Sequence, residues 1–407
     1  MNTLNQTIET HQPSQPAAWG GVFAMSLGAF ALIASEFMPV SLLTLIARDL
    51  HLSEGRAGQA ISISGAFALL TSLLITSLAR NIDRKALLMG LTALMVVSGT
   101  VVAFAPNELV FMGGRALIGI AIGGFWSMSA ASAMRLVPGH QVPRALAVVN
   151  GGNALATVVA APLGSFLGAL VGWRWAFFCV VPVAALAWLW KWRALPAMEA
   201  RPATRVGSVF KLLRQPVVAT GMVSVSLFFM GQFALFTYLR PFLETVTQVS
   251  VRELSLVLLV VGVAGFAGTI VIGACLKHGV YASLLSIPTL MAMLALVLIT
   301  QGHALMAVTV LLGFWGLLGT AAPVAWWTWL ARNLPHDAEA GGGLMVAVVQ
   351  LAIAVGATMG GVLFDRYGYQ ATFSLSAILL LASTGSAGLT ARLGRRHSAL
   401  PPSLSLD

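Results

Sequence analysis

The sequence predicts an all-α integral membrane protein with twelve transmembrane helices in two six-helix, pseudo-symmetric halves. Of its 407 residues, 58% are hydrophobic and only 9% are charged, whereas soluble domains usually contain about 25% charged residues. Charges and turn residues divide the apolar sequence into twelve segments, most of them close to the roughly 20 residues that a spanning helix needs. The longest polar interruption leaves six segments on each side, which predicts the two halves.

Each apolar segment is bounded by charged or turn-forming residues, and these set its limits. The first six segments are Trp19 to Ala47, Ala57 to Ala79, Ala86 to Ala105, Leu109 to Ala133, Ala145 to Val171 and Trp175 to Trp190. The second six are Val217 to Leu239, Leu254 to Leu276, Tyr281 to Thr300, Ala304 to Leu330, Gly343 to Phe364 and Ala371 to Ala391.

The polar stretches divide the chain into domains. Residues 1–18 contain no Lys or Arg, so they lack the basic start of a cleaved signal peptide and the first segment is expected to remain a span. The predicted order is a tail at 1–18, a bundle at 19–192, a linker at 193–215, a bundle at 216–391 and a tail at 392–407. We expect the chain to function as a monomer.

The basic residues follow the topology. The net charge of +10 would suit a nucleic-acid partner, but sixteen of the 23 Lys and Arg residues, Lys191 among them, fall on one side of the predicted spans. Six, including Arg240, fall on the other side, and Arg115 lies inside a span. This positive-inside bias predicts that both termini lie in the cytoplasm, and the protein is expected to be surrounded by lipid and to have no nucleic-acid partner.

Short motifs recur in the second half at a nearly constant offset of roughly 200 residues. The pairs are Pro39 with Pro241, Arg135–Pro138 with Arg332–Pro335, and Gly164–Leu167 with Gly360–Leu363, the last followed by Gly172 and Gly368. Parallel six-helix repeats of this kind typify a large class of transporters whose binding site lies near the membrane midplane.

Glu36 and Arg115 are the only ionisable residues expected well inside the apolar segments. A charge at the bilayer centre costs at least about 2.5 kcal/mol on insertion scales, which favours a functional role. The helical rise puts Glu36 roughly 5 Å and Arg115 about 9 Å from the centre, on the same side. The two side chains could therefore meet.

Pairs of glycines four residues apart predict close helix packing. They are Gly119 with Gly123, Gly164 with Gly168, and Gly356 with Gly360. The alternative is that the fifth and eleventh spans rock against each other on these surfaces.

Longer motifs resemble a known family. They are Glu36–Thr44, Leu52–Gly55, Gly123–Ala130, Met134–Pro138, Ala161–Gly168 with Gly172–Arg174, and Gly231–Pro241. Together with the layout, they resemble the major facilitator superfamily (MFS fold), and within it the twelve-span drug:H+ antiporter branch. The resemblance is strongest to bacterial purine ribonucleoside efflux pumps, with arabinose and other sugar efflux proteins as near relatives. It implies a location in the bacterial inner (cytoplasmic) membrane.

The superfamily motifs match unevenly. Arg115 followed by Gly119 agrees well with the fourth-span signature, whereas the fifth-span antiporter signature keeps only Pro162 and Gly164. In the loop after the second span, Arg84 and Lys85 agree but the usual acidic position does not. Asp83 either replaces that acidic gate residue from a shifted position or is a solvated loop charge.

The resemblance implies that the first and fourth spans line one cavity. A carboxyl group holds its proton more tightly in apolar surroundings and less tightly beside an arginine, so a changing separation between Glu36 and Arg115 would switch proton affinity. Glu36 would load a proton from the periplasm and release it inside as substrate leaves. The alternative is a static ion pair that pins two helices.

A purine nucleoside has a flat ring and a polar edge, which suit aromatic and amide side chains. Such groups are expected at membrane depth, and the substrate-binding candidates are Trp126, Asn153, Gln232, Phe236, Tyr238 and Gln350. The alternative is that the amides join helices and the aromatic residues only pack. Three further tryptophans, Trp326, Trp327 and Trp329, are expected to form an interfacial aromatic belt.

Other classes of function lack their motifs. The sequence has no Gly-Lys-Ser/Thr phosphate loop and no His-Glu-x-x-His, and its histidines are scattered through the predicted loops and the N-terminal tail, so we expect no enzyme, no metal and no cofactor. The expected function is export of a small neutral solute, with purine ribonucleosides as the expected substrates, in exchange for protons. Sugar or multidrug efflux, a proton-independent facilitator and a transporter-like sensor remain as alternatives.

Overall fold

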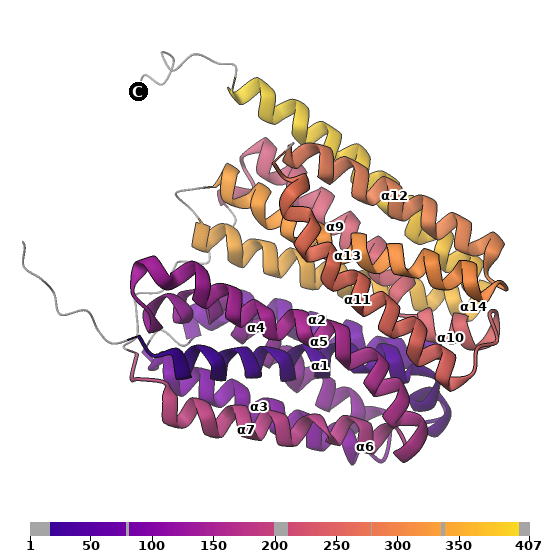
Figure 1. Ribbon diagram of the computed structural model, residues 1–407, viewed down its shortest axis with the longest axis horizontal. Helices are drawn as coiled ribbons and strands as arrows, with labels where there is room; N and C mark the ends of the chain where they lie inside the picture. The colour runs from indigo at the N-terminus through magenta and orange to yellow at the C-terminus, as the bar shows by residue number, and fades with distance from the viewer. Residues whose placement is uncertain (1–16, 79–80, 199–210, 278, 335–337, 399–407) are drawn as a thin grey trace, which may run out of the picture.

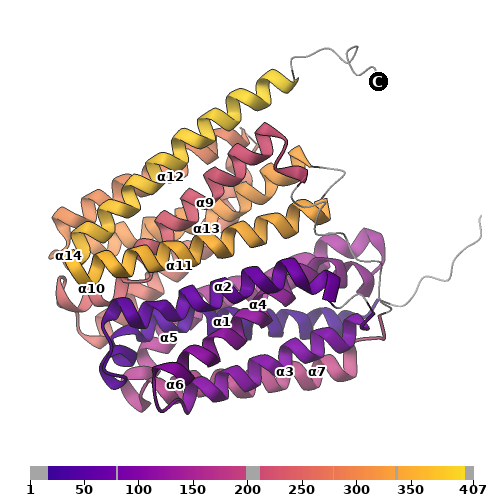
Figure 2. The same cartoon turned by 180° about the vertical axis from the view of Figure 1, so that it is seen from behind.

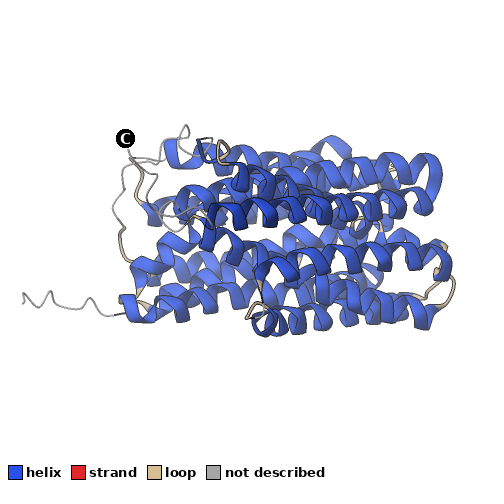
Figure 3. Cartoon of the chain, turned by 90° about the horizontal axis from the view of Figure 1, so that it is seen from above, coloured by secondary structure: helices blue, strands red, loops and turns tan. Residues whose placement is uncertain are grey.

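The computed structural model describes residues 17–78, 81–198, 211–277, 279–334 and 338–398, and in these ranges all regular structure is helical (Figure 3). The first half contains α1 (Trp19–Asp49), α2 (Glu54–Leu78), α3 (Arg84–Ala103), α4 (Glu108–Leu136), the short η1 (Gly139–Gln141), α5 (Val142–Val171), α6 (Trp173–Phe178) and α7 (Val180–Ala194). The second half contains α9 (Pro216–Phe236), α10 (Leu239–Thr245), α11 (Val251–Cys275), α12 (Val280–Gln301), α13 (Leu305–Asn333) and α14 (Ala338–Ser398).

These helices make twelve spans. In the described part of the chain, 11 helical segments are long and apolar enough to cross a membrane. The last one, Ala340–Arg395, contains two spans, because Gly368 interrupts α14 with φ 78, a left-handed conformation that favours glycine. The twelve-span fold is therefore confirmed. Helix α14 continues to Ser398, beyond the predicted bundle end at 391, and most of the linker and both tails lie outside the described residues.

The two halves lie side by side. In Figures 1 and 2 the indigo and magenta helices α1 to α7 form one bundle, and the salmon to yellow helices α9 to α14 form the other. The start of α1 and the end of α14 lie at the same end of the molecule, which we call the terminal end. The opposite end, with the turn at Leu50–Ser53, Gly172 and Gly368, is the distal end.

The glycine pairs fit helices together within each half. A methyl group at Gly119 would collide with the Ser64 carbonyl of α2, and one at Gly164 would lie 2.7 Å from the Ser41 hydroxyl of α1. A methyl group at Gly356 would collide with Met230 of α9. The packing interpretation holds, whereas rocking of the fifth and eleventh spans against each other on these surfaces is wrong, because each surface lies inside its own half.

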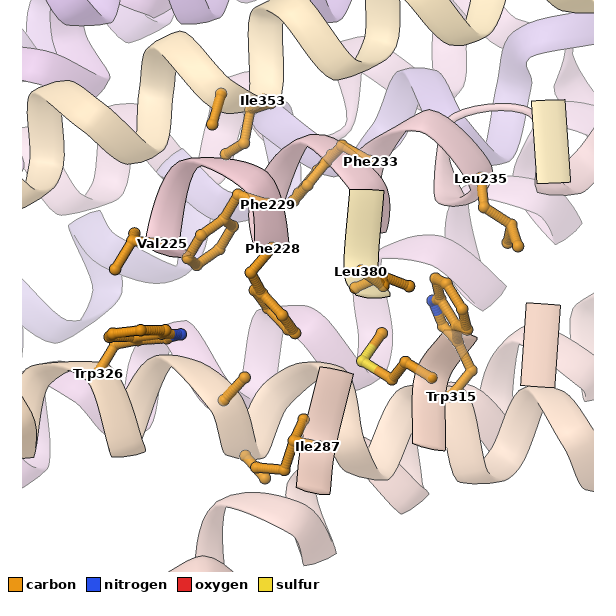
Figure 4. Packing of buried hydrophobic residues seen from close by; sticks show 14 of the residues in the cluster. Val225, Phe228, Phe229, Phe233, Leu235, Ile287, Trp315, Trp326, Ile353 and Leu380 are labelled. Atoms are coloured by element: carbon orange, nitrogen blue, oxygen red, sulfur yellow. The ribbon is translucent and has the colours of Figure 1, made fainter. Parts of the chain in front are cut away.

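The core of the second half contains two of the three tryptophans expected at the interface. Trp326 and Trp329 are 2% and 1% exposed, and their rings meet at 5.6 Å. Figure 4 shows Trp326 close to Val225 and Phe228 of α9. The belt prediction is wrong for these two residues because α13 turns them toward α9, and it remains possible only for the exposed Trp327.

Two more cations are buried than the sequence indicates. Lys191 of α7 is 0% exposed, donates to the Thr92 hydroxyl at 2.8 Å and lies 5.3 Å from the ring centroid of Phe125. Arg240 of α10 is 2% exposed. Both residues lie at helix ends and not well inside the apolar segments, but the expectation that they lie on the two membrane surfaces does not hold for their side chains, since long side chains at helix ends can reach inward.

Replacing Lys191 by Met is expected to raise the melting temperature in detergent. Among the described residues, no carboxylate forms an ion pair with Lys191, and an apolar side chain of similar length avoids burying an uncompensated charge, a gain of about 1 kcal/mol or more. Lys191→Ala is the matched control and should lower the melting temperature through the cavity it leaves. A lower melting temperature for Lys191→Met would show that the ammonium stabilises the bundle.

Candidate functional site

Arg115 joins three helices of the first half. Its guanidinium donates to the Ser35 carbonyl at 2.8 Å and the Glu36 carbonyl at 3.4 Å on α1. It also donates to the Ala60 carbonyl at 3.3 Å and the Ser64 hydroxyl at 3.4 Å on α2. Arg115 is 1% exposed, so neutral oxygens of α1 and α2 satisfy a buried cation carried by α4.

Glu36 lies beside this arginine but does not pair with it. No oxygen of its carboxyl group lies within 4.0 Å of the guanidinium, as the ion pairs of the described residues involve other groups. The guanidinium instead donates to the backbone carbonyl of Glu36, at 3.4 Å. The two residues thus come together, but not as a static ion pair.

Two glutamines of the second half have unused acceptors. Gln350 of α14 is 6% exposed, and its Oε1 has no hydrogen-bond partner. Gln232 of α9 donates from Nε2 to the Gly319 carbonyl at 3.4 Å, and its buried Oε1 also has no partner. An unpaired buried acceptor costs about 1–3 kcal/mol, so each one calls for an explanation such as a ligand.

Three phenylalanines connect the halves next to Glu36. Phe37 of α1 stacks on Phe233 at 6.1 Å and meets the edge of Phe236 at 6.2 Å, both from α9. Phe233 and Phe236 contact each other at 6.1 Å. We call this group the phenylalanine cluster. The candidate Phe236 belongs to it, so an aromatic surface lies one residue along α1 from the carboxyl group.

The other substrate candidates are placed differently. Trp126 is half-buried against Phe125, with ring centroids 5.5 Å apart, and Asn153 is half-buried on α5. Tyr238 is fully buried: its hydroxyl donates to the Ala357 carbonyl at 2.8 Å, and its ring stacks on Phe364. The Tyr238 hydroxyl therefore already donates its hydrogen bond within the second half, unlike the glutamine acceptors, which have no partner.

Asp83 has a structural role in the first half. It caps α3 by accepting from the backbone N–H groups of Lys85 and Ala86 at 2.7 and 3.1 Å, and it accepts from the Met198 N–H at 2.8 Å. It therefore holds the described start of the linker against α3 and is not a free loop charge. Arg84 and Lys85 lie half-buried at the terminal end. Pro162 lies inside α5, two residues before Gly164, which packs against Ser41 of α1.

Polar groups join the halves near the distal end. Asp365 of α14 accepts from the Ser53 hydroxyl at 2.6 Å and the Gly55 N–H at 2.9 Å. Thr358 contacts Gln59 and Ser62 of α2 at 3.1 and 2.8 Å. Arg240 donates to the Thr44 hydroxyl at 2.8 Å and the Ser41 carbonyl, and pairs with Glu244 at 2.8 Å.

We call these interactions between the halves the distal contact. They involve the first half of α2, the second half of α1 and the part of α14 just before Gly368, which all lie toward the distal end. Hydropathy does not single out Asp365 or Arg240, because each directly follows the end of a predicted span. Their only sequence signal was Arg240 within the Gly231–Pro241 motif.

Replacing Asp365 by Ala is expected to open the distal end. Hydrogen bonds to a charged group are worth about 1.5–3 kcal/mol, so losing two of them should increase labelling of a cysteine at Phe236 by at least about ten-fold. The measurement is the rate of reaction with a membrane-impermeant thiol reagent in protein lacking Cys179 and Cys275. Arg174→Gln is the control, since Arg174 pairs with Asp49 inside the first half. Equal rates for both variants would contradict the role of Asp365.

The family model described as Major Facilitator Superfamily matches residues 25–357. The chain belongs to the major facilitator superfamily. It is therefore a multi-pass membrane transporter and not an enzyme.

Two relatives that match most of the chain are named for different functions. The chain is 61% identical over 396 residues to the "Transcription regulatory protein OpdE" of Pseudomonas aeruginosa, covering 96% of this chain and 98% of that protein. It is 41% identical over 363 residues to the "Purine ribonucleoside efflux pump NepI" of Salmonella enteritidis, covering 89% and 91%.

Solved superfamily structures share the fold. A bacterial homologue of the human lysosomal transporter Spinster, in an inward-facing and unoccupied conformation, has a TM-score of 0.77 at 15% identity and covers 96% of this chain and 100% of that chain. The human organic anion transporter MFSD10 has a TM-score of 0.67 at 18% identity, covering 92% and 100%.

Proposed function

We propose that this transporter exports purine ribonucleosides in exchange for protons by alternating access. The substrate class is supported by the similarity to the purine ribonucleoside efflux pump, which extends over 89% of the chain. Proton exchange is supported by Glu36, an acidic residue that is buried in α1 of the first half.

The observation that carries the proposal is the state of Glu36. Glu36 is only 9% exposed, and among the described residues its carboxyl group forms no ion pair. The donors of Arg115 are directed to neutral oxygens, so the arginine acts on the carboxyl group through its charge and not by locking it. A carboxyl group of this kind can take up and release a proton without breaking a salt bridge.

The glutamines and aromatic rings suit the substrate. A purine ribonucleoside presents N–H and O–H donors, which match the unpaired Oε1 atoms of Gln232 and Gln350. Its ring can stack on the aromatic side chains of Trp126 or Phe236, and Asn153 can face it from the first half. We leave Tyr238 out of this set because its hydroxyl is already bonded inside the second half.

The distal contact defines one of the two access states. By the positive-inside bias of the sequence, the terminal end faces the cytoplasm and the distal end faces the periplasm. The arrangement described above is then the state that receives substrate from the cytoplasm. Export requires the distal contact, including the bonds of Asp365 and Arg240, to break.

A regulatory role is the second candidate, because the 61% identical relative is named as a transcription regulatory protein. We favour an indirect route, in which export changes the concentration of a metabolite that controls transcription. A Glu36→Gln variant would separate the two ideas. If the variant lost transport but kept its effect on transcription, regulation would be independent of export.

Uptake into inverted membrane vesicles tests the proposal. With the vesicle interior made acidic, labelled inosine, guanosine, adenosine, arabinose and a cationic dye are offered in turn. Nucleosides are expected to accumulate, and accumulation should respond to membrane potential, because exchanging one proton for a neutral solute moves charge. Accumulation of the dye alone would exclude nucleosides, and uptake insensitive to both pH and potential would indicate a facilitator.

A further inference from the structure

The amide of Gln232 is held in one orientation by the backbone of α13. Its Nε2 donates to the Gly319 carbonyl at 3.4 Å, and a methyl group at Gly319 would lie 2.7 Å from the same nitrogen. A carbonyl oxygen only accepts hydrogen bonds, so turning the amide over would set two acceptors against each other. The nitrogen therefore faces Gly319, and Oε1 is directed away from that carbonyl.

This orientation leaves Gln232 with an acceptor that has no partner. Its Oε1 is buried and accepts no hydrogen bond from the described residues. A buried oxygen that has given up water without gaining a donor is costly. A ligand that supplies an N–H or O–H to this oxygen recovers the loss, whereas a ligand that offers only acceptors there does not.

Gln232 shares one face of α9 with Phe236. Between Gly231 and Tyr238, these two side chains are half-buried and all the others are buried. They are four residues apart, which places them one above the other on a helix, about 6 Å apart along its axis. The Phe236 ring meets Phe37 of α1 at 6.2 Å, so this face of α9 is directed toward the first half.

Phe236 provides an aromatic surface next to the acceptor. Its ring contacts with Phe37 and Phe233 are both T-shaped, at 82° and 79°, and no ring in the described part of the chain is stacked parallel to it. Bases stack readily on such a side chain. A purine stacked on Phe236 extends its edge along the same face, and a hydrogen bond of about 2.9 Å then completes the distance to Gln232.

We propose that Gln232 selects purine bases that carry an N–H donor on the six-membered ring or its substituents, by accepting this hydrogen bond at Oε1. This inference rests on the proposed function, because it takes purine ribonucleosides as the substrates. Inosine, guanosine and adenosine each carry such a donor, whereas purine riboside, the ribonucleoside of unsubstituted purine, carries none. Gln232 is then a specificity-determining residue, and Gly319 is the positioning residue that orients its amide.

Exchange in proteoliposomes tests this inference without a pH gradient. Labelled inosine outside exchanges for unlabelled inosine inside, and unlabelled inosine or purine riboside is added outside as a competitor. With the unmodified protein, half-inhibition should require at least about ten-fold more purine riboside than inosine, since purine riboside leaves the buried acceptor unpaired.

Gln232→Met keeps the length of the side chain and removes the acceptor. Inosine should then compete no better than purine riboside, and the half-inhibiting concentration of purine riboside should stay close to its value in the unmodified protein. Purine riboside thereby reports whether the variant is folded. Gln350→Met is the matched control: it removes the other unpaired amide oxygen, which belongs to α14, so it should keep the ten-fold preference for inosine.

Gly319→Ala tests the orientation of the amide separately. The added methyl group displaces Nε2 from the carbonyl but leaves the glutamine in place, so the preference for inosine should be largely lost. Gly313→Ala adds a methyl group on the same helix, 3.3 Å from the side chain of Val260, and should keep the preference. A preference unchanged in Gly319→Ala would show that Gly319 does not orient Gln232.

The outcomes separate this inference from the proposed function. If inosine exchanges but purine riboside competes equally well, or if Gln232→Met keeps the ten-fold preference, purine ribonucleosides remain the substrates and the role of Gln232 is overturned. If the unmodified protein exchanges no inosine at all, the substrate class of the proposed function itself fails.

Discussion

Glu36→Gln is expected to reduce proton-driven nucleoside accumulation by at least about 100-fold, a typical loss when a group that transfers protons is removed. Glutamine has nearly the same shape but cannot release a proton, so the return step that depends on deprotonation is blocked. Exchange of labelled for unlabelled nucleoside should continue, since it needs no net proton movement. The measurement compares accumulation under a pH gradient with exchange at equal pH in proteoliposomes.

Glu36→Asp is the matched control for this result. It keeps a carboxyl group on a side chain one methylene shorter, and it should retain part of the proton-driven accumulation. If Glu36→Gln accumulated nucleoside normally under a pH gradient, the proton would have to bind elsewhere, and Glu36 would have only a structural role.

Arg115→Met is expected to destabilise the protein by at least about 1–3 kcal/mol, the cost of leaving a buried hydrogen-bond acceptor without its donor. The substitution leaves the acceptors on Ser35, Ala60 and Ser64 without their donor. Because these acceptors belong to α1 and α2, the junction of three helices loses its common partner. The measurement is the midpoint of thermal unfolding in detergent, together with transport by the surviving folded protein.

Two further variants separate charge from geometry at this position. Arg115→Lys keeps the charge but cannot reach both α1 and α2 at once, so it should lose less stability than Arg115→Met. Arg174→Met removes a partly exposed arginine whose ion pair with Asp49 is expected to contribute at most about 1 kcal/mol. If Arg115→Met unfolded no earlier than Arg174→Met, the bonds of Arg115 would not hold the junction.

Much of the fold follows from the sequence because each membrane span is one continuous stretch of apolar residues. A bilayer requires long apolar helices, so the twelve segments and the division into halves could be predicted without any tertiary contact. Gly368 illustrates the limit of this approach: the predicted break between two spans is present, but it occupies only one residue of a helical segment that continues on both sides.

Part of the site could also be predicted from the sequence. Glu36 and Arg115 stand out because a charge inside an apolar segment is costly, and their similar depth allowed the expectation that they meet. The sequence could not show that the guanidinium would bind carbonyl groups of α1 and α2 in place of the Glu36 carboxylate. That choice depends on the three-helix packing at Gly119, where α4 approaches α2.

The predicted solvent exposure is wrong for two charged residues near helix ends. Lys191 and Arg240 lie within a residue of the predicted span ends, so hydropathy assigns both to solvent. Whether such a side chain extends outward or folds back depends on what packs beside it. Gly28 leaves space for the Lys191 ammonium, and Ser41 and Thr44 provide acceptors for Arg240.

The sequence by itself determined the class of this protein, its spans, its two halves and the position of one acidic residue in the membrane. Only the tertiary structure decided which residues join the halves, since Asp365 and Gly55 are separated by 310 residues along the chain. Hydropathy and helical period report the surroundings of each segment, averaged over its length. Contacts between the halves depend on individual side chains across an interface, and no local pattern encodes them.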